Sequence, residues 1–316
     1  MKNSRLRTLM IGLTIGVLYA FFVMLLVTYF HKNVSITYIF ILPLTLGAIP
    51  VFFSTKEQLE SYKMYLIYPW IISFNFFILA WLFGFEGMIC LTIIVAPFFI
   101  IGTIGAFIFR LIKLQNEGKG TKLYSFFLMP LLFLAIESNI HPTKQIHTVI
   151  TSIQINSDQE KIWNNIKNVK NIREEEIDRH FIHFMGIPKP INGELNEEKI
   201  GGIRKITWEK GIKFEETITA WNEGVGFSYN IDVDPKSIPP QTLDEHVMIG
   251  GKYFDVLRGS YEIVQISKEN FKVILTCTYR VTTNLNTYSK TWANFILNDF
   301  NNMILGVIKN RCEAKY

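Results

Sequence analysis

The first 140 residues contain apolar runs of membrane-spanning length between short charged segments, and chains of this kind fold in few ways. A helix needs about 20 apolar residues to cross a bilayer core. The predicted spans lie near Thr8–Phe30, Ile36–Ser54, Met64–Gly84, Met88–Phe109 and Leu123–Ile136. The first run is too long for a signal peptide and lacks a small-residue cleavage site, so we expect it to be retained. The last run is short and contains Pro130, and its alternative is an interfacial or re-entrant helix.

Charged residues around these runs predict an orientation. Residues 1–140 carry ten basic and five acidic groups, and nine of the basic groups share one side of five spans, with Lys32 opposite. Because cytoplasmic loops are rich in Lys and Arg, we expect a cytoplasmic N-terminus and an extracytoplasmic domain at residues 141–316. With four spans that domain would be cytoplasmic. No Asp, Lys or Arg lies inside a predicted span, so this region is interpreted as an anchor or a small helical bundle.

Residues 141–316 carry as many acidic as basic groups, which argues against a nucleic-acid-binding domain. Alternating apolar and polar residues predict an antiparallel meander, with strands at 147–155, 202–208, 212–221, 226–233, 258–267 and 271–281. Ser157 and Glu160 are expected to form a capping box on a short helix. The acidic run Glu174–Glu176 is interpreted as a solvated face.

The segment Thr287–Arg311 predicts one long amphipathic helix, because its apolar residues recur at steps of three and four. They are Tyr288, Trp292, Phe295, Ile296, Phe300, Met303, Ile304, Val307 and Ile308.

This order of elements resembles the START-like superfamily, which includes polyketide cyclases, aromatase/cyclases, lipid-transfer domains and the birch-pollen allergen family. The patterns that carry the resemblance are TSIQINSDQEKIW at 151–163, Gly186–Pro190, Gly202-Ile-Arg with FEETITAW at 214–221, and Tyr288 with Trp292. The resemblance covers about 170 residues. It implies an α+β helix-grip domain, in which a curved antiparallel sheet wraps a long C-terminal helix and encloses a cavity for hydrophobic ligands. An N-terminal membrane region departs from the superfamily pattern.

Strand alternation selects an inward face on which a few residues are polar. They are Glu216, Tyr229, Tyr261 and Tyr279. An apolar pocket with a few placed polar groups is the usual design of a small-molecule site. A buried carboxylate at Glu216 would have a raised pKa and could act as a general acid or base, and the tyrosines could hold a carbonyl. The alternative is a structural glutamate paired with Arg204 or Arg258.

Further candidates lie on the last helix and in loops. Trp292 and Asp299 are candidate ligand contacts, and the favoured alternative for Asp299 is a solvated carboxylate. His246 is a candidate base or gate residue in the long connection Asp234–Val256, and His183 could act similarly. That connection contains Pro239-Pro240 and Gly250-Gly251, which suits either a lid or an ordinary surface loop.

No cofactor or metal motif is present, since the sequence lacks GxGxxG, P-loop, HExxH, CxxC and GxSxG patterns. Cys90, Cys277 and Cys312 are expected to be free thiols. The preferred function is a membrane-anchored module that binds a lipid or another hydrophobic small molecule. One alternative is an enzyme of the polyketide cyclase/aromatase kind that uses Glu216 or His246. Another is an interaction or sensing domain with a packed interior.

Overall fold

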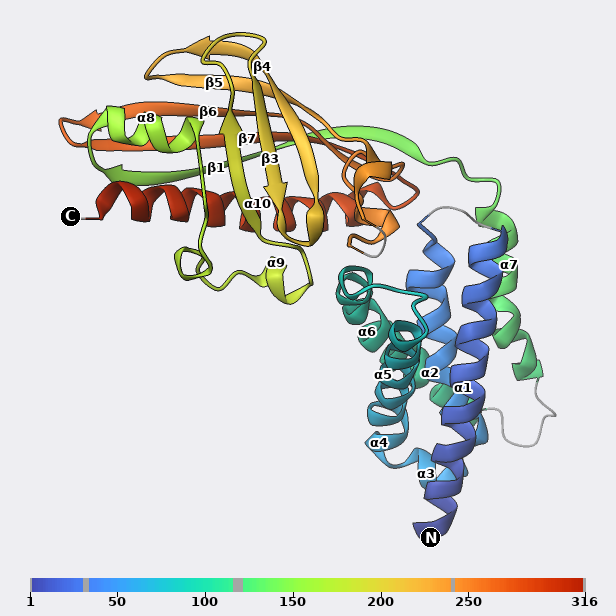
Figure 1. Ribbon diagram of the computed structural model, residues 1–316. Coiled ribbons are helices and arrows are strands. Elements are labelled where there is room, and N and C mark those ends of the chain that lie inside the picture. The colour runs from blue at the N-terminus through green and yellow to red at the C-terminus, as the bar shows by residue number, and fades with distance from the viewer. Residues whose placement is uncertain (1, 31–33, 116–121, 240–241, 315–316) are drawn as a thin grey trace. The chain divides into compact units, whose positions relative to one another are not determined.

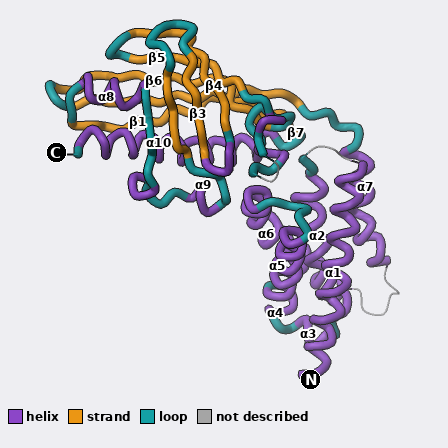
Figure 2. Tube along the Cα trace, viewed as in Figure 1, coloured by secondary structure: helices purple, strands orange, loops and turns teal. Residues whose placement is uncertain are grey.

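The computed structural model describes residues 2–30, 34–115, 122–239 and 242–314. The chain divides into two compact units, Met1–Pro142 and Thr143–Tyr316. The first unit is built of helices, and all strands in the described ranges belong to the second (Figure 2).

The first unit consists of α1 (Lys2–Phe30), a π-helical turn η1 (Thr37–Ile41), α2 (Leu42–Phe53), α3 (Lys56–Leu59), α4 (Tyr62–Tyr65), α5 (Ile67–Leu82), α6 (Met88–Gln115), the 3-10 helix η2 (Lys122–Leu128) and α7 (Met129–Glu137). Three helical stretches are long and apolar enough to cross a membrane, namely Leu6–Tyr29, Tyr62–Leu82 and Met88–Gln115. The shorter apolar helices are Thr37–Phe53 and Ser125–Glu137. Three of the five predicted spans therefore have the length and composition of a crossing, and the other two are helical but shorter.

Helices α2 and α6 pack with their backbones in close approach. A Cβ atom added to Gly47 would overlap the carbonyl oxygen of Gly102, and one added to Gly105 would overlap that of Leu44. Small residues at a crossing let helices pack this closely where apolar surroundings provide little drive for association. A side chain at either position would force α2 and α6 apart.

Polar contacts mark the two ends of this bundle. At one end, Thr8 Oγ1 donates to Gln58 Oε1 (3.2 Å), and Lys113 Nζ donates to three carbonyls at the end of α2 at 2.6–2.9 Å. At the other end, Glu137 accepts a hydrogen bond from Ser35 Oγ (2.9 Å) and two more from backbone N–H groups at the start of η1 (2.5 and 3.0 Å). The chain thus leaves α7 at the end of the bundle opposite to the first turns of α1.

The second unit contains β1 (Thr143–Asn156), α8 (Gln159–Lys167), α9 (Phe181–Phe184), β2 (Pro190–Leu195), β3 (Ile203–Trp208), β4 (Lys213–Asn222), β5 (Gly226–Asp232), β6 (Phe254–Ser267), β7 (Asn270–Thr283) and α10 (Asn286–Glu313). Its short 3-10 turns are η3 (Glu174–Glu176), η4 (Glu209–Gly211), η5 (Pro235–Ser237) and η6 (Glu245–Val247). The strands form one antiparallel sheet of seven in the order β1-β7-β6-β5-β4-β3-β2. The sheet curls over α10 (Figure 1), and the predicted helix-grip fold is confirmed.

One local prediction was wrong and one strand was missed. Helix α8 has Asp158 at its N-cap with no side-chain cap, and the Ser157 hydroxyl instead donates to the Cys312 carbonyl (3.0 Å), so the capping box does not form. Strand β2 was missed because its sequence PINGEL contains residues that disfavour strands. Proline is tolerated there because β2 is an edge strand.

The inner face of the sheet agrees with the assignment from alternation. The four polar residues assigned to the inner face are all buried, and Lys213, Glu215 and Lys272 on the opposite face are exposed. The core joins this face to α8 and to the last three turns of α10, from Met303 to Cys312. Burying large aliphatic and aromatic side chains stabilises a fold by about 1.5–3 kcal/mol each, so this core anchors α10.

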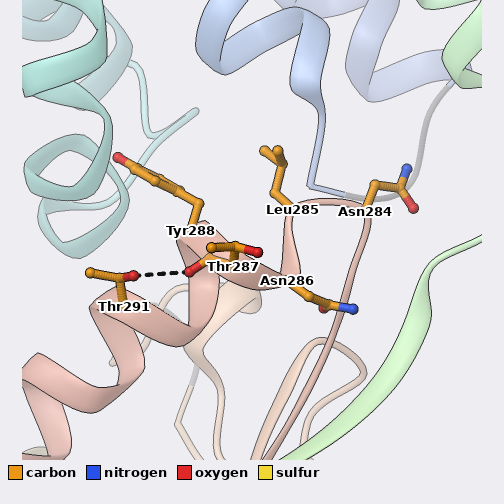
Figure 3. Close-up of a pocket in the computed structure, with 6 residues that line it drawn as sticks. All are labelled: Asn284, Leu285, Asn286, Thr287, Tyr288 and Thr291. Carbon is orange, nitrogen blue, oxygen red and sulfur yellow. Dashed lines mark hydrogen bonds between the residues drawn. The ribbon is translucent and has the colours of Figure 1, made fainter.

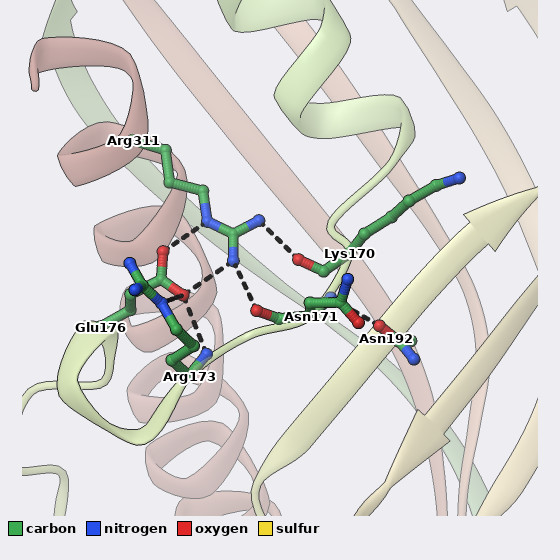
Figure 4. A network of polar contacts seen from close by, with 6 residues as sticks. All are labelled: Lys170, Asn171, Arg173, Glu176, Asn192 and Arg311. Atoms are coloured by element: carbon green, nitrogen blue, oxygen red, sulfur yellow. Dashed lines mark hydrogen bonds and ion pairs between the residues drawn. The ribbon is translucent and has the colours of Figure 1, made fainter. Parts of the chain in front are cut away.

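In the acidic run at η3, Glu174 and Glu175 are exposed, as expected for a solvated face, whereas Glu176 is part of a clamp on α10 (Figure 4). Arg311 Nε and Nη2 donate to the two carboxylate oxygens of Glu176 at 2.7 and 2.8 Å. The same guanidinium donates to the carbonyls of Lys170 (2.9 Å) and Asn171 (3.3 Å). Hydrogen bonding to Arg311 lowers the pKa of Glu176 to about 2. The clamp ties the segment before α9 to the end of α10.

Candidate ligand-binding site

A buried ion pair joins two neighbouring strands on the inner face. Arg204 on β3 and Glu216 on β4 are directly opposed in the strand register. Arg204 Nη1 donates to Glu216 Oε2 at 3.0 Å, and only 4% and 7% of the two side chains are exposed. Arginine and glutamate are rarely buried unless they are paired. The alternative of a glutamate paired with Arg204 is therefore what the structure contains, and Arg258 is exposed.

Three further polar side chains extend this pair across the sheet. They are Tyr229 on β5, Tyr261 on β6 and Cys277 on β7, all buried. The guanidinium carbon of Arg204 lies 5.8 Å from the Tyr261 ring centre. Glycine at 259 makes room for this arrangement, because a Cβ there would overlap the Tyr229 hydroxyl. We call Arg204, Glu216, Tyr229, Tyr261 and Cys277 the interior polar cluster.

Burial determines the protonation of the cluster. It raises the pKa of Glu216, although the adjacent Arg204 opposes that shift. Burial is the largest single effect on the pKa of Arg204 and lowers it, but Glu216, Tyr261 and Tyr229 together outweigh burial, so the net shift is upward. Burial also raises the pKa of Tyr261 and of Cys277 to about 12 in each case. Near neutral pH the tyrosines and the thiol are therefore uncharged, and Arg204 remains a cation.

One donor of the cluster is unsatisfied. Arg204 Nε is buried and has no hydrogen-bond partner among the described residues. Leaving a buried donor unpaired costs about 1–3 kcal/mol, and more for a charged group. A core needed only for folding would gain nothing from such a group, since apolar residues can replace a buried ion pair without loss of stability. The cluster is therefore a candidate site rather than a structural necessity.

The remaining candidates on the inner face and α10 lie outside this cluster. The Tyr279 hydroxyl donates to Asn294 Oδ1 (2.6 Å), which ties β7 to α10. Trp292 is half-buried, and its ring contacts that of Phe295, which is 44% exposed. The prediction of a single apolar face on α10 is wrong in its first turns, because Trp292 and Phe295 do not enter the core.

Asp299 is engaged in holding α9 rather than in the cluster. Its carboxylate contacts His180 Nδ1 (2.9 Å) and accepts the Ile182 N–H (3.0 Å). His183 makes a parallel contact to α10, with its Nε2 3.2 Å from the Met303 sulfur. These contacts fix α9 against α10.

The connection between β5 and β6 carries the other histidine. The His246 ring packs on Tyr253 with centroids 4.8 Å apart, and burial lowers the His246 pKa. Pro239 and the glycines Gly250 and Gly251 belong to the described part of the connection, whereas Pro240 lies outside the described residues. The ring contact of His246 with Tyr253 does not involve the interior polar cluster.

Sequence reasoning gave Arg204 only as an alternative partner of Glu216, although a signal was present. Arg204 shares its strand face with Ile206 and Trp208, both of which are buried, so alternation places it inward. A second signal lay in α10, where asparagines interrupt the apolar repeat. We call this set, Asn286, Asn294, Asn298 and Asn301, the asparagine seam. Its members hydrogen bond to β1 and β7.

An open pocket of about 380 Å³ lies at the turn between β7 and α10 (Figure 3). It is lined by Asn284, Leu285, Asn286, Thr287, Tyr288 and Thr291. Within it Thr291 Oγ1 donates to the Thr287 carbonyl (2.9 Å). Its walls come from a single turn, and it is separate from the interior polar cluster. Over the described part of the chain, no group of three or more His, Cys, Asp or Glu could hold a metal ion.

No protein-family model and no curated protein matches this chain. Solved structures of START-like and cyclase-type proteins do match it. The di-domain ARO/CYC BexL from the BE-7585A biosynthetic pathway is 11% identical, with a TM-score of 0.34, 67% of this chain covered and 61% of that one. This chain therefore spans less than two thirds of that structure.

Two single-domain structures are covered almost completely. A START superfamily protein from Mycobacterium smegmatis is 9% identical with a TM-score of 0.35, over 53% of this chain and 97% of that one. Truncated norcoclaurine synthase from Thalictrum flavum is 11% identical with a TM-score of 0.32, over 56% of this chain and 99% of that one. The fold described above rests on this chain's own strands and helices, and none of these similarities assigns it a ligand or a reaction.

Proposed function

We propose that residues 143–316 form a module that binds a lipid or another hydrophobic small molecule between the sheet and α10. The observation that carries this proposal is the interior polar cluster, with its buried ion pair and unsatisfied Arg204 donor. The surroundings are apolar, and a few polar groups in an apolar interior provide orientation and specificity for a ligand. The START-like solved structures have the same kind of architecture.

The cyclase-like alternative has less support. A general base needs a basic side chain within hydrogen-bond reach of the proton that it removes. Glu216 is instead bound to Arg204 at 3.0 Å, and His246 stacks on Tyr253. The alternative of a solidly packed interaction domain predicts that no ligand binds, and the experiment below separates it from the proposal.

We also propose that the first unit anchors this module in a membrane by five traverses, with the N-terminus in the cytoplasm and the module outside. Support comes from the basic residues on one side of the apolar runs. The hydrogen bonds of Lys113 and Glu137, at opposite ends of the bundle, also favour an odd number of traverses. Four traverses would place the module in the cytoplasm.

Ligand extraction tests the binding function. The full chain is purified in lipid nanodiscs, and the organic molecules released from it are compared with those from an Arg204→Met/Glu216→Leu variant. That variant replaces the ion pair by apolar residues of similar volume and is expected to fold. We expect wild type to release an apolar molecule in a fixed molar ratio to the protein. The variant should release none of it. Equal extracts from both proteins, with no uptake of added lipid, would favour the packed interaction domain.

Labelling in cells tests the orientation. Cysteines are introduced at Glu269, in the exposed turn between β6 and β7, and at Glu60, exposed after α3. The native cysteines are buried in the structure. We expect a membrane-impermeant maleimide to label Glu269→Cys in intact cells and Glu60→Cys only after lysis. The reverse pattern would refute the extracytoplasmic placement, and labelling of neither cysteine in intact cells would indicate four traverses.

A further inference from the structure

We infer that the interior site takes an uncharged ligand that presents one oxygen acceptor, such as an ester, ketone or amide carbonyl, to Arg204. This inference names the ligand class of the binding function proposed above and rests on it. It follows from the charge balance of the cluster, from its unsatisfied donor and from the apolar side chains around it.

The charge balance excludes ionised ligand groups. Arg204 and Glu216 neutralise each other at 3.0 Å, and no more than 7% of either side chain is exposed. A carboxylate or phosphate would bring a second negative charge beside Glu216, and an ammonium group a second positive charge beside Arg204. An uncompensated charge in an apolar interior is strongly unfavourable. The other members of the cluster, Tyr229, Tyr261 and Cys277, stay neutral because burial raises the pKa of each.

The hydrogen-bonding pattern selects an acceptor. Arg204 donates a hydrogen bond from Nη1 to Glu216, while its Nε–H has no partner among the described residues. A guanidinium offers only donors, so the group that satisfies Nε must be an acceptor. A neutral carbonyl oxygen meets this need without changing the charge of the site.

The body of the ligand is expected to be apolar. The guanidinium lies 5.9 Å from the Phe227 ring centre and 5.8 Å from that of Tyr261. Buried Ile218 and Leu275 belong to the same core. A ligand would reach Arg204 by displacing ring contacts, and the ring faces would then line its hydrocarbon part.

Paired fluorescent probes test the charge preference. The full chain in nanodiscs is titrated with cis-parinaric acid and with its methyl ester, which share a hydrocarbon chain and differ in charge. Identical nanodiscs carrying the Arg204→Met/Glu216→Leu variant supply the background from lipid partitioning. We expect wild type to bind the ester at least tenfold more tightly than the acid. In Glu216→Gln the positive charge of Arg204 is no longer neutralised. We therefore expect the affinity for the acid to rise at least tenfold relative to the affinity for the ester.

The outcomes separate the two proposals. Equal or tighter binding of the acid by wild type would overturn the inference, as would an unchanged ratio in Glu216→Gln, and either result leaves the binding function standing. Binding of neither probe by wild type would contradict the binding function itself. If Glu216→Gln fails to fold, the molecule that copurifies with wild type decides the question. An ester, ketone or amide supports the inference, and a stoichiometric carboxylate or phosphate lipid overturns it.

Discussion

The two halves of α10 contact the sheet through different chemistry. From Met303 to Cys312 the helix faces a continuous apolar core formed with α8 and the inner strands. From Asn286 to Asn301 it contacts β1 and β7 through the asparagine seam. Tyr279 donates to Asn294, and the Thr151 hydroxyl lies 3.0 Å from Asn298 Oδ1 and 3.3 Å from Asn301 Nδ2.

This difference indicates that the second half of α10 can stay fixed to the core while the first half, which borders the interior, changes position. Apolar packing resists change, because a cavity left in a core is costly. Hydrogen bonds contribute less net stability, about 0.5–1.5 kcal/mol each, since water can replace either partner. We therefore expect the first half of α10 to open more readily than the second. Access to the interior would then be easiest beneath the asparagine seam.

The largest expected effect comes from the second half. Leu305 is fully buried in the core, and Leu305→Ala should lower the free energy of unfolding by about 2–5 kcal/mol. Hydrogen exchange resolved by mass spectrometry should show this loss in peptides from both halves and from the sheet. A loss confined to residues 303–312 would contradict the view that this half anchors the domain.

The clamp between Glu176 and Arg311, at the end of the second half, should make a pH-dependent contribution to the free energy of unfolding. The Glu176 pKa is about 2, below its ordinary value of 4.5, so the stabilisation is present above pH 4.5 and is lost as the pH falls toward 2. Since both side chains of the pair are partly exposed, we expect about 1–2 kcal/mol.

Denaturant titrations of wild type and Glu176→Gln at pH 6 and pH 3 measure this contribution. The difference in free energy of unfolding between wild type and Glu176→Gln should be smaller at pH 3 than at pH 6. Glu175→Gln, an exposed change one residue away, is the matched control. If this difference in free energy of unfolding is the same at both pH values, Arg311 does not stabilise the ionised carboxylate of Glu176.

A smaller and more local effect is expected in the first half. Asn294→Ala removes the acceptor of the Tyr279 hydroxyl, and the remaining contact to the Lys290 carbonyl is long, at 3.4 Å. We expect a loss of about 1 kcal/mol. Exchange should increase in residues 286–300 while the second half stays protected. An equal increase in hydrogen exchange in both halves of α10 would contradict the view that the first half is held less firmly.

The smallest effect is expected on the outward side of the same turns. Phe295 is 44% exposed, and its ring packs beside those of Phe181 and Trp292. Phe295→Ala should change the free energy of unfolding by less than about 0.5 kcal/mol, as surface substitutions usually do. A loss of the size expected for Leu305→Ala would place Phe295 in the core and restore a uniform apolar face.

Periodicity predicted the fold well where one face of an element is consistently apolar. Along β4 to β7 the sequence alternates over most of each strand, and burial of Ile218, Tyr229 and Val273 follows that pattern. Strand β2 escaped prediction because tertiary pairing, rather than propensity, holds Pro190–Leu195 in the sheet. The helix α10 was assigned correctly as an element, but its apolar residues were assumed to lie on one face.

The candidate site was predictable in part. Alternation alone placed Glu216, Tyr229 and Tyr261 on the inner face. The partner of Glu216 was left open between Arg204 and Arg258, although the apolar residues Ile206 and Trp208 on the strand face of Arg204 favour Arg204. The roles suggested for Trp292 and Asp299 depended on helix rotation, which a repeat of three and four residues defines only loosely.

The position of β1 in the sheet has a consequence for biosynthesis. Among the strands, β1 pairs only with β7, from Thr143 opposite Thr283 to Asn156 opposite Asn270, and α10 follows β7 in the chain. During translation β1 therefore leaves the ribosome long before its partner, while Ile146 and Ile150 stay exposed even in the finished fold. Pairing over such sequence distances is slow and leaves unpaired strand edges open to aggregation. The nascent domain is thus expected to depend on chaperones until the last strand and helix have emerged.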